Sequence, residues 1–427
     1  MVNQGLVQYV LYDILSVDDS EDLIITFPSE TEITVLIGGK TYVEPTFDVE
    51  NLQLDEVDFG VLDKLMDFVS NIENTGTINR ESINVGNIRF IKLCFFFVNE
   101  HYLTFPRVLD IHGRVSSKSV NDKYLRYLEF PVVDVLKHQF HLVFCKDLPI
   151  EKTLFLTTDL DFIDLWKYLG LWKTIYRIGR HLLHGRWKTF SYEVQSLFKS
   201  REKLEFNPLL LHLKFETSQL KNINVKKIAF LHNSRSSTYD FENDLEMNSF
   251  REFLQTIGKD FELAIHPSYN TRFIQGLMRD QVTHYAKTLL QDPQLSRFHY
   301  LNCDYPNDLD CLLGNGISTD FSFYFADSML FRGGISSSFK MWSVERNEPV
   351  MVNIIPITVM DVTLSEEFSL SFHDARELSI KKVKRSLMFG SSCCLLWHNN
   401  NMYKEFSKEN YLPQLFTDIL LEISNIK

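Results

Sequence analysis

The chain has 427 residues, more than one compact domain usually holds, so we expect two domains. With 44% hydrophobic and 23% charged residues it has the composition of an ordinary globular protein that can bury a large core. Its formal net charge of −12 argues against general nucleic-acid binding, because attraction to phosphates requires a basic surface.

The amino terminus shows no basic start followed by a long apolar stretch, the pattern of a secretory signal. The longest apolar runs, such as residues 93–98, fall far short of the ~20 residues that span a bilayer. The six cysteines lack the paired spacing of zinc modules, and nothing demands an oxidising compartment. These patterns predict a cytoplasmic protein without a transmembrane segment.

Residues 1–148 predict a smaller α+β accessory domain. Strand-type runs at 24–27 and 33–37 are followed by Gly38 and Gly39 as a turn, and the acidic segment 48–58 is typical of a loop or solvated face. Farther on, Pro131 opens a helix. His112 and Arg114, in a polar turn at 110–114, could reach a ligand, but we favour a turn held by side-chain hydrogen bonds.

Residues 149–427 alternate strand, polar loop and helix, as a parallel β/α barrel or a doubly wound sheet requires. The predicted strands end near residues 158, 231, 265 and 301. The predicted helices cover residues 162–183, 271–290, 306–313 and 411–423. In the helix over 271–290 we expect Phe273 and Ile274 to pack on the sheet, and His284 to face solvent.

The helix over 162–183 carries basic residues between apolar ones, which include Trp172, Tyr176 and Leu183. A basic amphipathic segment in an acidic protein could contact a membrane surface or an anionic glycan. We favour the simpler interpretation, a solvated face that balances nearby acids.

Side chains suited to metal binding follow the predicted strands. Asp159 and Asp161 end the run from Thr153, and alternate residues of an extended chain point the same way. His266 follows the strand at 261–265, and His299 lies in the next one. Because parallel strands end at one edge of a sheet, two carboxylates and two imidazoles there predict a divalent-metal site. Taken alone, the stretch from Thr153 to Asp161 has a second interpretation, in which Asp159 and Asp161 cap the following helix.

The chain also resembles the polysaccharide deacetylases (carbohydrate esterase family four and its relatives), specifically a bacterial branch with an N-terminal domain of unknown function. No single matching piece is specific, but their order and spacing over roughly residues 90 to 400 are those of the family. The pieces are, in order, residues 110–114, 158–161, 237–240, 262–270, 296–301, 316–322, 331–334, 360–364 and 397–399. The resemblance implies a distorted, incomplete (β/α) barrel of the deacetylase type over residues 149–427.

The resemblance to polysaccharide deacetylases also implies a metal held by Asp161, His266 and His299, with zinc as the expected ion and cobalt or nickel as alternatives. The sequence departs from the family pattern twice. Leu160 separates two acids that are usually adjacent, and Asn270 stands where a second histidine usually follows the first by four residues. Either Asn270 supplies an oxygen ligand or the missing imidazole comes from elsewhere, and His299 is the natural donor.

By the same resemblance, Asp159 is the general base and His398 protonates the leaving amine. Arg297 or Arg332 would keep Asp159 ionised, and Asp361 would orient a site residue. A strand-end histidine tied to backbone remains an equal alternative for His398, and a loop histidine, His232, is interpreted as solvated.

The predicted function is therefore metal-dependent removal of N-acetyl groups from amino sugars of a bacterial glycan or its precursor. An N-acetylated glycan would be the partner. The replacement at Asn270 motivates an alternative, an inactive glycan-binding or assembly protein on the same fold. A different metal-dependent hydrolase or a sugar-nucleotide enzyme is a third possibility, although no Gly-rich phosphate loop supports nucleotide binding.

Overall fold

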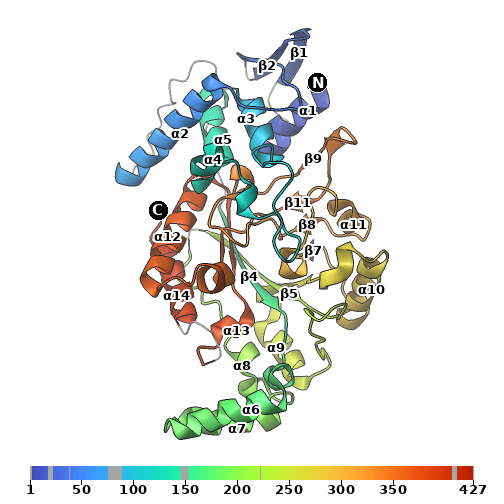
Figure 1. The fold of residues 1–427 in the computed structure, drawn as a ribbon, viewed down its shortest axis with the longest axis vertical. Coiled ribbons are helices and arrows are strands. Elements are labelled where there is room, and N and C mark those ends of the chain that lie inside the picture. Colours follow the sequence, from blue (N-terminus) through green and yellow to red (C-terminus); the bar gives the residue numbers. More distant parts are fainter. Residues whose placement is uncertain are drawn as a thin grey trace.

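The structure, a computed structural model, describes residues 2–17, 23–37, 39–75, 89–145, 152–221, 223–405 and 411–426. Its centre is an eight-stranded parallel sheet in the order β11-β8-β7-β6-β5-β4-β13-β12, which curls into a half barrel (Figure 1). The strands are β4 (Thr153–Leu160), β5 (Asn224–Leu231), β6 (Phe261–Ile265), β7 (Leu295–Ser296), β8 (Thr319–Asp320), β11 (Asn353–Ile354), β12 (Val359–Met360) and β13 (Ser392–Leu396).

The sheet is buried on both faces along β4, where seven of the eight residues are buried. A strand covered on both faces need not alternate, and β4 carries the unbroken apolar run Leu154–Leu156 in its first half. Every strand pair runs parallel, so all the carboxyl ends lie along one edge. The predicted α/β class with a barrel-like parallel sheet is confirmed at this level.

Helices cover the sheet and extend from it (Figure 1). They are α6 (Leu165–Leu183), α7 (Trp187–Lys199), α8 (Pro208–Leu211), α9 (Asn248–Ile257), α10 (Leu277–Leu289), α11 (Leu309–Leu313), α12 (Phe372–Phe389), α13 (Asn399–Met402) and α14 (Leu412–Ser424). The predicted helix over 271–290 begins only at Leu277, because Gly276 has a φ of 84° and breaks the helical backbone. Phe273 and Ile274 are consequently exposed rather than packed on the sheet. His284 faces solvent as expected.

The first 145 residues add a three-stranded antiparallel sheet, β1 (Leu23–Ser29), β2 (Glu32–Ile37) and β3 (Lys40–Pro45), to several helices. The helices are α1 (Gln4–Tyr9), α2 (Glu56–Thr75), α3 (Phe90–Val98), α4 (Asp122–Leu125) and α5 (Val132–Phe144). The turn residue Gly38 and the domain boundary at 148/149 lie outside the described residues. One apolar cluster contains residues from both halves, so the predicted division stays a prediction.

The acidic segment 48–58 is not wholly a solvated face. Glu56 begins α2, and Asp58 is buried, where its carboxylate pairs with the ammonium of Lys92 at 2.6 Å. Among the described residues, no helix combines the length and apolar character needed to cross a bilayer.

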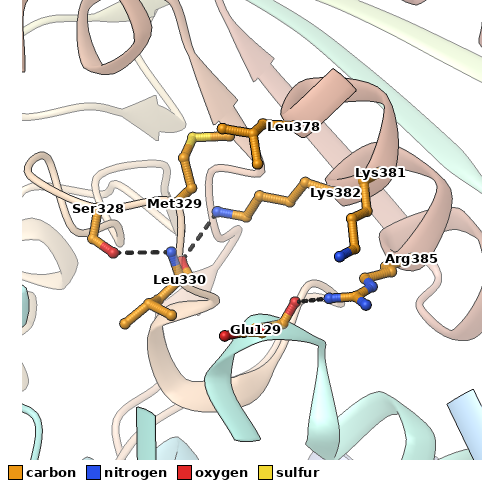
Figure 2. Close-up of a pocket in the computed structure, with 8 residues that line it drawn as sticks. All are labelled: Glu129, Ser328, Met329, Leu330, Leu378, Lys381, Lys382 and Arg385. Carbon is orange, nitrogen blue, oxygen red and sulfur yellow. Dashed lines mark hydrogen bonds between the residues drawn. The ribbon is translucent and has the colours of Figure 1, made fainter. Parts of the chain in front are cut away.

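A buried lysine on α12 should make the stability of the fold depend on pH. Lys382 lines a pocket of about 300 Å³, where its ammonium donates to the carbonyl of Leu330 at 3.0 Å (Figure 2). The ammonium also lies 4.9 Å from the ring centre of Tyr324. Burial lowers the pKa of Lys382 from 10.5 to about 7. Above that pH the unfolded chain binds the proton more tightly, so the stability contributed by this site rises with pH.

We therefore expect Lys382→Met to remove this dependence. Relative to the variant, the parent protein should gain roughly 2 kcal/mol of unfolding free energy between about pH 7 and about pH 9. Urea unfolding of both proteins across that range measures the difference. A constant difference would mean that Lys382 titrates normally in the folded protein.

Candidate metal centre

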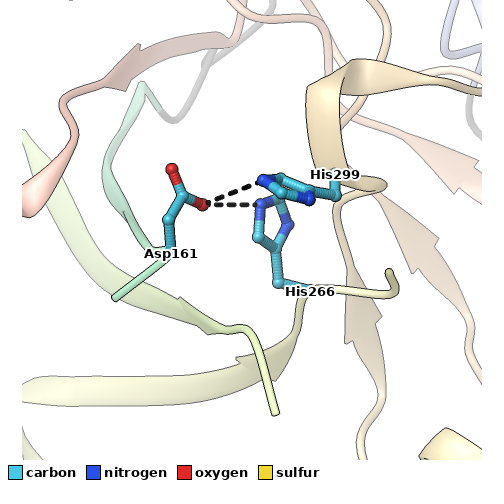
Figure 3. Close-up of side chains that lie close together, drawn as sticks. All are labelled: Asp161, His266 and His299. Atoms are coloured by element: carbon cyan, nitrogen blue, oxygen red, sulfur yellow. Dashed lines mark ion pairs between the residues drawn. The ribbon is translucent and has the colours of Figure 1, made fainter. Parts of the chain in front are cut away.

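Three potential metal ligands meet at the carboxyl edge of the sheet. Asp161 follows β4, His266 follows β6, and His299 begins a turn shortly after β7. The Oδ1 atom of Asp161 lies 3.2 Å from Nε2 of His266 and 3.6 Å from Nε2 of His299 (Figure 3). One ligand atom from each residue falls within 4.8 Å of the others, which is the spacing that a single ion requires.

Hydrogen bonds orient both imidazoles for metal binding. Nδ1 of His266 lies 2.5 Å from the carbonyl oxygen of Arg297, which can only accept, so this nitrogen carries the proton. Nδ1 of His299 in the same way faces Oδ1 of Asp240 at 2.8 Å. With the proton on Nδ1, Nε2 is in each ring the nitrogen left to bind an ion, and it points to Asp161, an arrangement typical of histidine ligands with supporting partners.

The carboxylate of Asp161 also fits a cation. Its Oδ1 is buried and accepts no hydrogen bond from any described residue, although buried acceptors normally have a partner. Burial alone would raise the pKa of Asp161, but the imidazoles of His266, His299 and His398 outweigh burial and lower it. One carboxylate and two neutral imidazoles are a donor set suited to zinc, and they leave coordination positions for water and substrate.

Asn270 does not join this set. Its backbone N–H donates to Oγ of Ser236, and its side-chain amide donates to the Ser236 carbonyl at 2.8 Å. Of the two alternatives for the missing imidazole, the structure places His299, not Asn270, beside Asp161. Asn270 instead holds the loop after β5 in place.

His232 is buried beside the site, so its interpretation as a solvated loop histidine is wrong. Its Nδ1 donates to the carbonyl of His266 at 3.1 Å, and its Nε2 lies 3.6 Å from Oδ1 of Asp240. Burial lowers the pKa of His232 to about 3, so the ring is neutral. His232, Asp240 and His299 form a second group with the spacing of a metal site.

Asp159 is held by a buried arginine. Nη1 of Arg297 lies 2.7 Å from its Oδ1, and Nη2 donates to Thr157 at 2.9 Å. The guanidinium is fully buried and stacks over the ring of Phe230 at 4.2 Å. The second oxygen of Asp159 faces the site, 3.7 Å from Nε2 of His266. Arg297 thus contacts Asp159, as the sequence suggested.

His398 lines the same pocket as the metal ligands and is fixed by Asp361. The two Asp361 oxygens accept from Nδ1 and from the backbone N–H of His398, both at 2.8 Å. Nε2 then points to Asp159 and Asp161, 4.0 and 3.9 Å from their carboxylates. Burial favours the neutral ring, but Asp361 and then the two site acids outweigh it and raise the pKa of His398 to about 10. The imidazolium is therefore available as a proton donor.

Arg332 has a different role from the predicted one. Its guanidinium is buried against Glu100, with Nε 2.6 Å from the carboxylate, and does not contact Asp159. The glycines that follow it do not open the backbone to a substrate either. A Cβ on Gly334, where φ is 61°, would come within 2.6 Å of Val132. The segment packs the two halves of the chain together, because a buried arginine needs a buried carboxylate and Glu100 supplies it.

The site residues line a pocket of about 340 Å³. Its lining combines these polar residues with the rings of Phe162, Tyr168, Tyr239, Phe241 and Tyr300. Arg114 also lines it and donates from Nη1 to the carbonyl of Tyr300 at 2.9 Å. The turn at 110–114 is held by Asp110, as predicted from side-chain hydrogen bonds, and also reaches the pocket.

The chain has few matches among known proteins. No family model matches the chain, and no curated protein matches it. A solved structure that resembles it is the crystal structure of a Mycobacterium smegmatis protein named provisionally as a polysaccharide deacetylase. The two share 14% sequence identity with a TM-score of 0.35, and the match covers 64% of this chain and 85% of that one.

Proposed function

We propose that the protein is a metal-dependent hydrolase that removes N-acetyl groups from amino sugars of a glycan or glycan precursor. The observation that carries the proposal is the meeting of Asp161, His266 and His299 at one sheet edge, with Asp159 and His398 on the same pocket. The sequence resemblance to polysaccharide deacetylases supports the same chemistry.

The three ligands would hold a divalent ion, with zinc the best match to one carboxylate and two imidazoles. When bound, such an ion supplies Lewis-acid polarisation of the acetamide carbonyl and lowers the pKa of water. Asp240 and the carbonyl of Arg297 keep the two imidazoles in the tautomer that binds an ion.

Proton transfer would fall to Asp159 and His398, which both line the pocket. Asp159, paired with Arg297, accepts the proton of the attacking water, whose oxygen forms the new bond to the acetyl carbon. The C–N bond then breaks, and His398 donates its Nε2 proton to the departing amine. Asp361 orients His398 and favours its charged form before the transfer. The products are acetate and the free amino sugar.

The aromatic rings of the pocket suit a sugar substrate. Tyr239 and Tyr300 both line it with ring centres 5.5 Å apart, and the ring of Tyr269 lies 4.6 Å from that of Tyr239. Aromatic faces pack against the apolar C–H faces of sugar rings while hydroxyls stay hydrated. The acetamide would then reach the carboxylates and imidazoles that line the same pocket.

Acetate release from N-acetylated glucosamine oligosaccharides by zinc-loaded protein tests the proposal. We expect release by the parent protein and a fall of about 10²- to 10⁴-fold in His398→Gln, the range that a general acid contributes. His373→Gln serves as the matched control, because its side chain is 86% exposed on α12. Binding of the oligosaccharides with no acetate release in the zinc-, cobalt- or nickel-loaded protein would favour a glycan-binding protein instead.

A further inference from the structure

The helices α6 and α7 pack against each other as a hairpin at the bottom tip of the molecule in Figure 1. The hairpin begins beside the candidate metal centre, because Asp164 caps α6 only three residues after Asp161. Glu193 of α7 holds it together by accepting from Arg177 of α6 at 2.9 Å. The rest of both helices extends away from the parallel sheet.

This hairpin exposes an unusual number of large apolar side chains. Trp172 is 81% exposed and Leu183 is 85% exposed. The other exposed apolar residues are Tyr168, Leu171, Ile175, Tyr176, Leu182, Trp187 and Phe198. The apolar side of the predicted amphipathic helix, which includes Trp172, Tyr176 and Leu183, is therefore exposed. A concentrated apolar patch of this kind marks an interaction surface rather than an ordinary solvated helix.

An apolar recess of about 540 Å³ lies between the two helices. Leu171, Ile175 and Ile178 line it from α6, and Val194 and Phe198 line it from α7. Its lining is almost entirely hydrocarbon, so the recess offers room for a chain of methylene groups beside the exposed rings.

The charge of the hairpin is opposite to that of the whole chain. Residues 165–199 contain seven Lys or Arg and one acid, Glu193, a net charge of +6 in a chain whose net charge is −12. The seven are Lys167, Lys173, Arg177, Arg180, Arg186, Lys188 and Lys199. Except for Arg177, which pairs with Glu193, these side chains are exposed.

We propose that the α6–α7 hairpin docks the protein on an anionic lipid surface. Trp and Tyr side chains favour the boundary between headgroups and hydrocarbon, and Lys and Arg beside them attract anionic headgroups. The charge complementarity selects this occupant over a second copy joined hairpin to hairpin, since two surfaces of +6 repel each other.

Docking would also bring the candidate pocket to the lipid surface. Tyr168 at the start of α6 stacks on Phe162 with ring centres 3.8 Å apart, and both residues line that pocket. We therefore infer that the substrate is an N-acetylated amino sugar carried by a lipid in the same membrane. This inference about the substrate rests on the proposed function.

Co-sedimentation of the full-length protein with vesicles tests docking without any measure of activity. We expect binding to equimolar phosphatidylcholine and phosphatidylglycerol, weak binding to phosphatidylcholine alone, and loss of binding as salt rises. The variant Trp172→Ser/Tyr176→Ser/Leu183→Ser should bind the anionic vesicles at least about tenfold more weakly. Its matched control is Phe273→Ser/Leu290→Ser, which removes exposed apolar side chains elsewhere.

A second pair of variants tests the charge. Lys173→Glu/Arg180→Glu should weaken binding to the anionic vesicles at least about tenfold, since each basic residue near such a surface contributes about fivefold. The control Lys64→Glu/Lys287→Glu makes the same change on exposed faces of α2 and α10 and should bind as the parent does. Acetate release from soluble oligosaccharides should stay at the parental level in all four variants.

Two results would overturn the proposal. One is parental binding to anionic vesicles by both hairpin variants. The other is no vesicle binding by the parent together with self-association, seen by size-exclusion chromatography, that the serine variant abolishes. A third result is possible: the protein binds vesicles through the hairpin but releases no acetate. That result would support docking and reject the proposed function.

Discussion

Replacing Asp161 with alanine should remove bound divalent metal and abolish acetate release together. Its Oδ1 is the one atom that both facing imidazole nitrogens approach, at 3.2 and 3.6 Å, so no remaining donor of this group can replace it. We expect His266→Ala to have the same effect. Because removal of a supporting partner alone costs about 10- to 100-fold in metal affinity, loss of a direct ligand should cost more than about 100-fold.

The loss of metal affinity is measured as the metal content after dialysis against zinc, and circular dichroism checks the fold. Asp280→Ala is the matched control, since Asp280 is exposed on α10. The metal content of Asp240→Asn should lie between that of Asp161→Ala and that of the control, because Asp240 holds His299 rather than the ion. If Asp240→Asn loses the metal and Asp161→Ala keeps it, the ion belongs to the neighbouring group of His232, Asp240 and His299.

The position of the site could be predicted from one rule of parallel sheets. Asp161, His232, His266, Arg297 and Asp361 each stand immediately after the last residue of a strand. Applying the rule to every strand would have found His232, which follows β5 just as His266 follows β6. It was missed because its loop is polar, and polarity was interpreted as exposure. The loop is instead folded inward, where the His266 carbonyl accepts from Nδ1 of His232 and Asp240 accepts from the backbone N–H and the hydroxyl of Ser236.

Contacts between distant segments could not be predicted in this way. Arg332 and Glu100 are separated by 232 positions, and nothing local distinguishes an arginine that joins two halves of a chain from one that serves a site. The same holds for α6, whose pattern predicts an apolar face but not whether anything covers it. Periodicity reports which residues share a side of a helix, and only the tertiary structure decides what lies against that side.

The Arg297→Met variant should be strongly destabilised. Arg297 is fully buried and makes its ion pair with Asp159, which is itself buried. Removal of one member of such a pair leaves an uncompensated charge and costs about 3 to 5 kcal/mol. Urea unfolding at neutral pH measures the change. Arg297→Lys should recover only part of it, because a lysine cannot also donate to Thr157 and to the carbonyl of Phe321.

The double variant Arg297→Met/Asp159→Asn separates the structural role of this pair from its catalytic one. With both charges gone, no buried carboxylate is left unpaired, so most of the lost stability should return. Acetate release should not return, because the asparagine amide cannot accept the proton of the attacking water. If the double variant is as unstable as Arg297→Met, the cost comes from lost packing against Phe230 and not from the charge of Asp159. If it regains activity, the general base lies elsewhere in the pocket.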